Sequence, residues 1–212
     1  MKGFFVVFEG IEGAGKSTLL EVLSSLFRER GIPFVKTREP GGTETAEPIR
    51  KIILDRNLSI EPITELLLLM ASRHENTVKK ILPALDSGKV VISDRYRDSS
   101  LAYQGYGRGI DLSFIEELND IVTGGLQPDV VFIIDIPVDL MMKRIERREH
   151  NRMDIQTRDF YERVRRGYLE IARRDPERYF VLDGNRDVEE ITKDIVSILN
   201  KKLKEKGVGY AL

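Results

Sequence analysis

The sequence predicts an α/β fold, in which a doubly wound, five-stranded parallel sheet carries helices on both faces. Two observations support this prediction. Five short apolar runs recur along the chain, and longer stretches with helical spacing of apolar residues separate them. The runs are apolar at consecutive positions, which is typical of strands buried on both faces of a parallel sheet. We expect residues 1–212 to form a single domain.

The expected strands are short and most are rich in Val, Ile and Phe. They are Phe4–Phe8, Phe34–Thr37, Val90–Ser93, Val130–Ile136 and Tyr179–Leu182. The expected helices span roughly 16–30, 62–86, 112–123, 138–148, 157–174 and 187–205. The helix at 157–174 places its apolar residues on one stripe and its many arginines elsewhere. The glycines of the segment 207–209 predict a frayed tail.

Composition excludes several classes of protein. The 34 Lys and Arg residues offset 35 Asp and Glu residues to a net charge of −1, which argues against a general nucleic-acid coat protein. The absence of cysteine excludes disulfides, thiolate zinc sites and a cysteine nucleophile. The apolar stretches are too short to cross a bilayer, and the first one ends at Glu9, too early for a signal peptide. We expect a cytoplasmic protein with no nucleic-acid or membrane partner.

A phosphate-binding motif, G-x-x-x-x-G-K-S, follows the first expected strand and opens the first expected helix. Its small residues let successive backbone N–H groups point at phosphate oxygens, and the helix adds its positive dipole end. The fold is therefore expected to be of the P-loop NTPase type. The expected nucleotide-binding residues are Gly10, Ile11, Glu12, Gly13, Ala14, Gly15, Lys16, Ser17 and Thr18.

The P-loop alone leaves GTPases, ATPase motors and small-molecule kinases open. The chain lacks the N-K-x-D guanine-reading motif, and it is short for a motor. Ser17 offers a hydroxyl to Mg²⁺, and Asp94, at the end of the third expected strand, offers the carboxylate. The alternative role for Asp94 is a helix or turn cap.

Further polar residues follow the strands at the edge where open α/β sheets bind ligands. The forked guanidinium of Arg95 suits a second phosphate group, with Arg38 as its partner. Ser100 and Gln104 share a face if 99–104 is helical, and together suit a neutral ring amide. The pattern fits equally well two ordinary polar residues on the protein surface. Arg73 continues an apolar stripe, so it either snorkels, pairs with an acid or faces a ligand.

Taken together, these segments resemble the thymidylate kinase family. Its members are the nucleoside monophosphate kinases that phosphorylate dTMP. The resemblance spans most of the chain and keeps the family's order. The matching pieces are F-E-G-I-E-G-A-G-K-S-T at 8–18, T-R-E-P-G-G-T at 37–43, A-S-R at 71–73, D-R-Y-R-D-S-S-L-A-Y-Q-G at 94–105 and N-R-M-D at 151–154. The second and fourth pieces are much more specific than the P-loop.

The resemblance implies a role for each matching residue. Lys16 and Ser17 would hold the ATP phosphates and Mg²⁺, with Asp94 near the metal. The residues implied for dTMP are Glu12 at the sugar 3′-hydroxyl, Arg38 and Arg95 at the acceptor phosphate, Arg73, Ser100 and Gln104 at the thymine edge, and Tyr103 where a ribose 2′-hydroxyl would project. The family also implies a homodimer. The adenine contacts are expected near Arg144 and in the loop 183–185 after the last expected strand.

A lid is expected at about 146–156. One subgroup of the family carries a catalytic arginine in the P-loop, whereas the stretch 12–14 has none here. The other subgroup supplies arginines from the lid, where this chain has Arg147, Arg148 and Arg152. Such cations would neutralise charge on the transferring phosphoryl group, so this chain resembles the lid-arginine subgroup.

Two residues depart from the family pattern. Leu69 stands where the family often has a Phe that stacks on the base, and Arg97 stands where an apolar residue is more usual. Leu69 keeps open a kinase for dUMP or for several monophosphates. A catalytically inactive ATP-binding regulator is the alternative outside the enzymes, and the presence of Lys16, Ser17, Asp94 and Arg95 argues against it.

Overall fold

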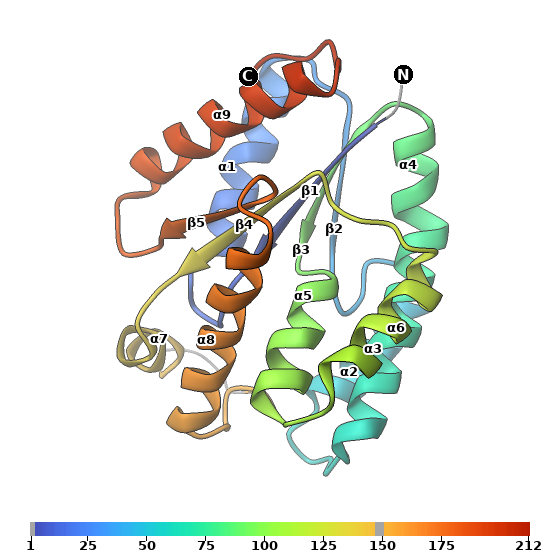
Figure 1. Cartoon of the computed structure of the whole chain (residues 1–212), viewed down its shortest axis with the longest axis vertical. Helices are drawn as coiled ribbons and strands as arrows, with labels where there is room; N and C mark the ends of the chain where they lie inside the picture. The colour runs from blue at the N-terminus through green and yellow to red at the C-terminus, as the bar shows by residue number, and fades with distance from the viewer. Residues whose placement is uncertain (1–2, 147–150) are drawn as a thin grey trace.

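A computed structural model describes residues 3–146 and 151–212 of the chain (Figure 1). Its sheet has five parallel strands in the order β2-β3-β1-β4-β5. The strands are β1 (Phe4–Glu9), β2 (Phe34–Arg38), β3 (Val90–Asp94), β4 (Val130–Asp135) and β5 (Tyr179–Asp183). Each expected strand is confirmed to within one residue at either end. The three central strands β3, β1 and β4 are buried almost throughout, as their unbroken apolar runs predict.

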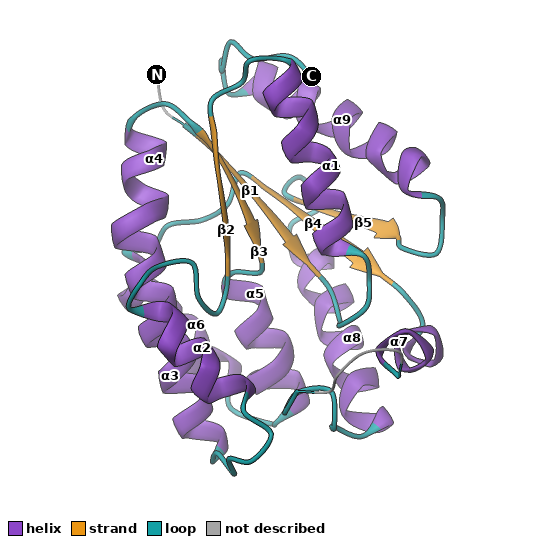
Figure 2. Ribbon diagram, turned by 180° about the vertical axis from the view of Figure 1, so that it is seen from behind, coloured by secondary structure: helices purple, strands orange, loops and turns teal. Residues whose placement is uncertain are grey.

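Helices cover both faces of the sheet, as expected. Helix α1 crosses one face with α9 beside it, α8 lies on the opposite face, and α5 lies beyond the carboxyl end of β3 (Figures 1 and 2). The helices are α1 (Lys16–Glu29), α2 (Ala46–Leu54), α3 (Pro62–Asn76), η1 (Thr77–Ile81), α4 (Leu82–Asp86), α5 (Arg97–Ser100), η2 (Leu101–Gly107), α6 (Leu112–Thr123), α7 (Val138–Ile145), α8 (Arg158–Arg174) and α9 (Val188–Glu205).

Three differences from the expected helices matter for the site. The stretch 62–86 is one continuous helical run, but its middle part, η1, is a π-helix. Helix α2 was not expected, because it has only nine residues and includes a proline. The conditional helix at 99–104 exists as the end of α5 and the start of η2, so Ser100 and Gln104 lie one turn apart.

The expectation of a frayed tail is wrong. Val208 is buried against the core, and the Tyr210 hydroxyl donates to the carbonyl of Gly88 at 3.3 Å. The backbone N–H of Leu212 donates to Asn200 Oδ1 at 2.8 Å. Apolar and polar contacts of α9 and the α4–β3 turn therefore hold residues that two glycines alone would leave loose.

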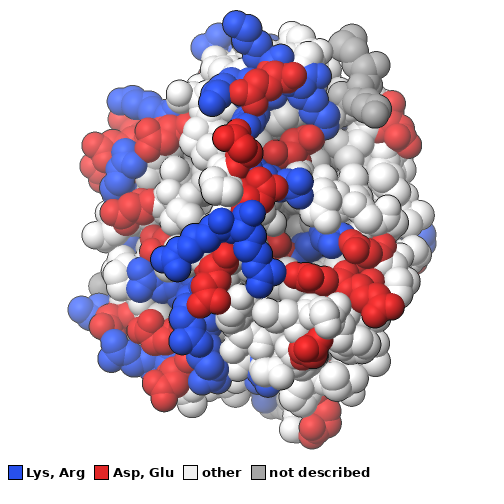
Figure 3. Space-filling view, viewed as in Figure 1, with Lys and Arg blue, Asp and Glu red and all other residues white. Residues whose placement is uncertain are grey.

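The carboxyl ends of the strands gather the polar residues. Because all strands are parallel, their last residues lie along one edge, and every one is charged: Glu9, Arg38, Asp94, Asp135 and Asp183. Elsewhere acidic and basic side chains are interspersed on the visible face (Figure 3), in keeping with the balanced net charge. Within the described residues, no helix combines the length and apolar character needed to span a bilayer.

Candidate active site

One cavity of about 410 Å³ opens at this edge of the sheet. A volume of this size is typical of small-molecule sites. Its walls come from the loop after β1, the segment after β2, helices α2 and α3, the β3–α5 turn, η2, the end of α7, Asn151 and Met153. The parallel sheet thus brings together residues that are more than 130 positions apart in the sequence.

The loop from Gly10 to Gly15 has the backbone conformation that its glycines predict. Gly13 and Gly15 have φ angles of 65° and 94°, in the left-handed region that favours glycine. At Gly10, a Cβ atom would lie 2.4 Å from the carbonyl oxygen of Ile134, so only glycine fits there. The loop leads directly into the N-terminus of α1, where backbone N–H groups can bind an anion.

Lys16 lies across the inner side of this loop. Its Nζ donates to the carbonyl oxygens of Gly10 and Ile11 at 2.8 and 2.9 Å. Burial lowers the pKa of Lys16 to about 8, and the positive charge of Arg95 contributes to the same shift. An anionic ligand at this position would favour the charged ammonium group again.

Ser17 and Asp94 form an oxygen pair that fits Mg²⁺. Ser17 Oγ donates to Asp94 Oδ2 at 3.3 Å, and Asp94 Oδ1 is buried without a hydrogen-bond partner. Among residues 3–146 and 151–212, no group of three or more His, Cys, Asp or Glu side chains could hold a metal by itself. The pair therefore suits a cation that takes its other ligands from phosphate oxygens and water, as Mg²⁺ usually does.

Arg95 lines the cavity between the phosphate-binding loop and η2. Its backbone φ angle is 72°, in the left-handed region, and its side chain reaches Glu12 at 2.9 Å and the Tyr103 hydroxyl at 3.2 Å. The Tyr103 hydroxyl also donates to Glu12. Tyr168 on α8 accepts a hydrogen bond from Arg95 at 2.9 Å. The guanidinium is thus fixed between the phosphate loop and η2.

Arg73 forms a buried polar wall on the other side of Arg95. It pairs with Glu39 at 2.7 Å and donates to Ser100 Oγ at 2.9 Å, and both ionic side chains are nearly fully buried. Asn119 and the backbone oxygen of Tyr96 accept further hydrogen bonds. Of the alternatives open from the sequence, Arg73 both pairs with an acid and lines the cavity.

Gln104 and Leu69 complete this part of the wall. The amide nitrogen of Gln104 donates to Glu65 at 2.7 Å, and its Oε1 atom is buried without a partner. Half-buried Leu69 supplies an apolar surface beside them. Arginine, hydroxyl and amide groups around an apolar face can recognise a flat polar ring.

The two arginines near the end of β2 are held differently. Arg38 lies next to Asp94 in the sheet, but its side chain is exposed, pairs with Glu47 at 2.9 Å and does not line the cavity. Arg50 on α2 does line it, and donates to the carbonyl of Pro40 at 2.8 Å. Arg50 was not expected at the site, because α2 itself was not expected.

The expected ATP-contacting residue Arg144 and the expected lid arginines differ in position. Arg144 lines the cavity and donates to the carbonyl of Gly13 at 2.9 Å. Arg152 is buried outside the lining, where it donates to the carbonyl of Ile53 at 2.7 Å and to Glu65. Arg147 and Arg148 lie outside the described residues.

Comparison with known proteins identifies the family to which this chain belongs. A family model described as Thymidylate kinase matches residues 8–195. A thymidylate kinase of Kosmotoga olearia is 44% identical over 206 residues, which cover 97% of this chain and 99% of the relative. The chain belongs to the thymidylate kinase family.

Other members of the thymidylate kinase family are similar to this chain over nearly its whole length. A relative from Thermoanaerobacter sp. is 41% identical over 203 residues, covering 96% of this chain and all of its own. The crystal structure of thymidylate kinase from Ehrlichia chaffeensis superposes with a TM-score of 0.78 at 37% identity, covering 94% of this chain and 99% of that one. The α/β fold expected from the sequence is thereby confirmed.

The cavity brings together most of the residues that sequence analysis singled out. The expected residues that line it are Glu12, Gly13, Ala14, Gly15, Lys16, Ser17, Thr18, Leu69, Arg73, Asp94, Arg95, Ser100, Tyr103, Gln104 and Arg144. Gly10 and Ile11 lie behind it as the acceptors of Lys16. Three further charged residues at the cavity, Glu39, Arg50 and Glu65, were not expected.

Arg97, which departs from the thymidylate kinase pattern, has a structural role. Its guanidinium donates to Thr123 Oγ1 at 3.1 Å and to Asp120 Oδ1 at 2.6 Å, both on α6. A hydrogen-bonded charge thus replaces apolar packing between α5 and α6.

Proposed function

We propose that this chain transfers the γ-phosphoryl group of ATP to dTMP, giving dTDP and ADP. Membership of the thymidylate kinase family supports both the reaction and the acceptor. The structural observation that carries the proposal is the shared cavity, which joins the phosphate-binding loop to the buried polar wall through Arg95. A donor phosphate at the loop and a flat base at the wall would therefore meet at Arg95.

The donor phosphates are assigned to the loop from Gly10 to Thr18. Its N–H groups and the ammonium group of Lys16 would neutralise the β- and γ-phosphates. Arg144, hydrogen-bonded to the carbonyl of Gly13, is assigned to the outer part of ATP. Ser17 and Asp94 would hold Mg²⁺, which supplies positive charge to the same phosphates when it is bound.

The acceptor nucleotide is assigned to the opposite part of the cavity. Arg73, Ser100 and Gln104 would read the thymine edge, with Leu69 against its face. Glu12 and Tyr103, which are hydrogen-bonded to each other, suit the deoxyribose hydroxyl region. Arg95 and Arg50 would bind the acceptor phosphate, and Arg38, which pairs with Glu47 outside the cavity lining, is assigned as their partner.

Catalysis requires little proton transfer in this arrangement. The attacking oxygen belongs to an ionised phosphate, so no strong general base is needed. Arg95 and Lys16 would align the acceptor and donor phosphates and neutralise charge in the loose transition state. The lid arginines Arg147 and Arg148 are assigned to the same task, since the P-loop stretch 12–14 carries no arginine. Arg152, expected for this task from the sequence, is instead bound to Glu65 and to the carbonyl of Ile53 outside the cavity lining. The chain would then belong to the lid-arginine subgroup.

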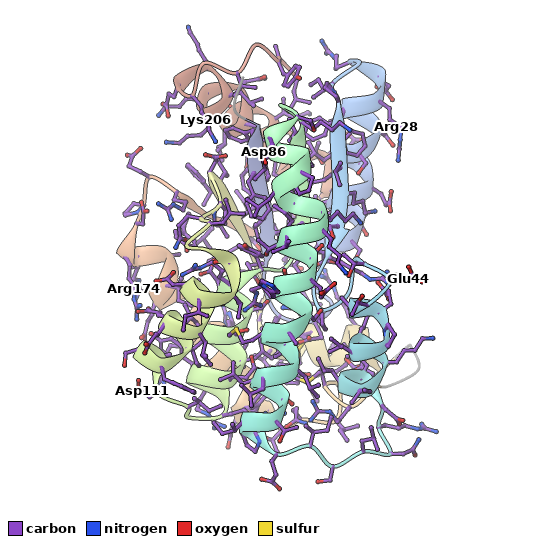
Figure 4. The ribbon with its side chains drawn as sticks, turned by 90° about the vertical axis from the view of Figure 1, so that its right-hand side faces the viewer. Arg28, Glu44, Asp86, Asp111, Arg174 and Lys206 are labelled. Atoms are coloured by element: carbon purple, nitrogen blue, oxygen red, sulfur yellow. The ribbon has the colours of Figure 1, made fainter. Side chains whose placement is uncertain are left out.

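We further propose that residues 1–212 act as one kinase domain, with a lid at about 146–156, and that it works in the cytoplasm as a homodimer. The exposed apolar residues on α3 and α6 support the dimer: Ile63, Leu67, Phe114 and Ile121. The two helices pack side by side on this side of the molecule (Figure 4). Contiguous exposed apolar side chains are typical of self-association surfaces.

ADP release with ATP and Mg²⁺ tests the proposal across dTMP, dUMP, ribothymidine monophosphate, dCMP, dGMP and AMP. We expect dTMP to have the highest kcat/KM. Comparable values for several monophosphates would favour the broader kinase that Leu69 leaves open. ATP binding without turnover on any of them would favour an inactive regulator.

A further inference from the structure

A fully buried carboxylate, Glu65 on α3, adjoins the base-reading part of the cavity. It has no exposed surface and accepts hydrogen bonds from three side chains. Gln104 Nε2 lies 2.7 Å away, Arg108 donates through Nε and Nη2 at 3.0 and 3.1 Å, and Arg152 donates through Nη2. One carboxylate thus faces two arginines and one amide.

These partners keep Glu65 ionised. Burial by itself would raise the pKa of the carboxyl group, but the hydrogen bonds from Arg108, Gln104 and Arg152 and the charge of Arg108 together lower the pKa below its ordinary value. An ionised carboxylate can only accept hydrogen bonds. Glu65 therefore requires a donor from each side chain that faces it.

This requirement fixes the Gln104 amide. Only its nitrogen can face Glu65, because the opposite orientation would place the amide oxygen against the carboxylate. The Oε1 atom must then point away from Glu65, and it is buried without a hydrogen-bond partner. Since Gln104 lines the cavity, this orphan acceptor is available to a ligand's N–H group.

We propose that Glu65 is a positioning residue. It fixes the orientation of the Gln104 amide, so that the base pocket offers a hydrogen-bond acceptor and not a donor. By presenting Gln104 as an acceptor, it selects pyrimidines with a ring N3–H donor, such as thymine and uracil, over cytosine, whose N3 is itself an acceptor. This inference deepens the proposed function and rests on it. Glu65 acts through Gln104 and takes no part in the transfer of the phosphoryl group.

The comparison of dUMP with dCMP isolates this effect. Both lack the 5-methyl group, so they differ only along the N3 and C4 edge of the base. We expect the unmodified chain to favour dUMP over dCMP by at least about 100-fold in kcat/KM, because dCMP leaves buried polar groups unpaired.

Glu65→Gln tests the role of the charge. Its amide can present either oxygen or nitrogen, so Gln104 is free to turn over and offer its nitrogen to the base. We expect the dUMP-to-dCMP ratio to fall at least about tenfold, while the KM for ATP stays unchanged. Glu190→Gln, which neutralises an exposed partner of Arg186 on α9, is the matched control and should leave the ratio as it is.

The exchanged pair Glu65→Gln with Gln104→Glu provides a rescue. It keeps one carboxylate and one amide at the same hydrogen bond, but moves the carboxylate to position 104. The amide introduced at position 65 can then donate to one oxygen of that carboxylate and leave the other oxygen as the acceptor, so we expect the preference for dUMP to return. A residue that only stabilises the fold would lower both rates together and would not be rescued.

An unchanged ratio in folded Glu65→Gln overturns the inference, as does efficient use of dCMP by the unmodified chain. If the single variant does not fold, the dUMP-to-dCMP ratios of the exchanged pair and of the unmodified chain still test the inference. A lack of dTMP turnover in the unmodified chain would overturn the proposed function instead. Calorimetric binding of dUMP and dCMP would then still measure the selectivity.

Discussion

At the scale of single residues, the two arginines near the end of β2 show how neighbouring cations can differ in function. Arg50 lines the cavity, whereas Arg38 is exposed and paired with Glu47. We expect Arg50→Ala to raise the KM for dTMP about 10- to 100-fold, because a direct phosphate contact is lost, and to leave the KM for ATP unchanged. Steady-state kinetics that show a larger effect of Arg38→Ala would contradict this assignment.

Asp98 gives a prediction about pH. Burial raises its pKa to about 7, and the charge of Glu9 acts in the same direction. Because the folded state then binds a proton that the unfolded state has lost, this residue's stabilising contribution is complete below about pH 4 and is lost as the pH rises through about 7.

Asp98→Asn should remove that dependence. The amide oxygen can still accept from the Tyr179 hydroxyl, which donates to Asp98 at 3.1 Å. We expect the variant to match the unmodified chain below about pH 4 and to exceed its free energy of unfolding by on the order of 4 kcal/mol at pH 8. Denaturant titrations at several pH values measure the difference, and a constant difference would contradict the prediction.

Some site residues could be predicted from the sequence because their signals are local. The P-loop is a contiguous motif, and Asp94 and Arg95 directly follow a strand that its apolar run identifies. Arg50 and Glu65 carry no such signal. Arg50 depends on a short helix that the pattern does not predict, and Glu65 is a charged residue whose burial depends on Arg108 and Arg152, which approach it from distant segments.

At the scale of elements, α8 and η2 pack closely behind the site. A Cβ atom on Gly167 would lie 2.6 to 2.9 Å from three atoms of Tyr106, so the two helices approach through this glycine. Because η2 carries Tyr103 and Gln104, this contact also supports one wall of the cavity.

Gly167→Ala should therefore destabilise the protein by about 1–2 kcal/mol, since the overpacking outweighs the better helix propensity of alanine. Gly209→Ala is the control, because open space surrounds that position and its φ angle is not positive. Equal denaturation midpoints for the two variants would show that α8 and η2 accommodate the added methyl group without loss of stability, and would contradict the prediction.

The sequence predicts elements best where burial is uniform. The three central strands are the most recognisable, because both faces of the sheet are covered there and apolar residues run without interruption. The edge strands β2 and β5 are only partly buried. Helix α2 is too short for a clear stripe, and the π-helical turns of η1 and η2 change the spacing on which periodicity depends. Those elements are fixed by tertiary contacts that a local pattern does not contain.

At the scale of the whole molecule, the α3–α6 surface carries the prediction about assembly. Leu67 is 51% exposed on α3, and Ile121 is 67% exposed on α6. Leu67→Glu should shift the protein from dimer to monomer, because a charge would be buried between two apolar surfaces. Light scattering after size exclusion measures the mass, with the exposed Val188→Glu on α9 as the control. A monomeric unmodified chain would overturn the proposed dimer.

The orphan oxygen of Gln104 also constrains the design of inhibitors. A compound that fills the cavity with apolar groups alone would leave this acceptor without a hydrogen-bond partner, because it would displace water from it. The loss of binding free energy would be about 1–3 kcal/mol. That corresponds to roughly a 5- to 150-fold loss of affinity. Screening libraries for this protein should therefore be enriched in flat lactams and imides, whose N–H group can occupy the same place.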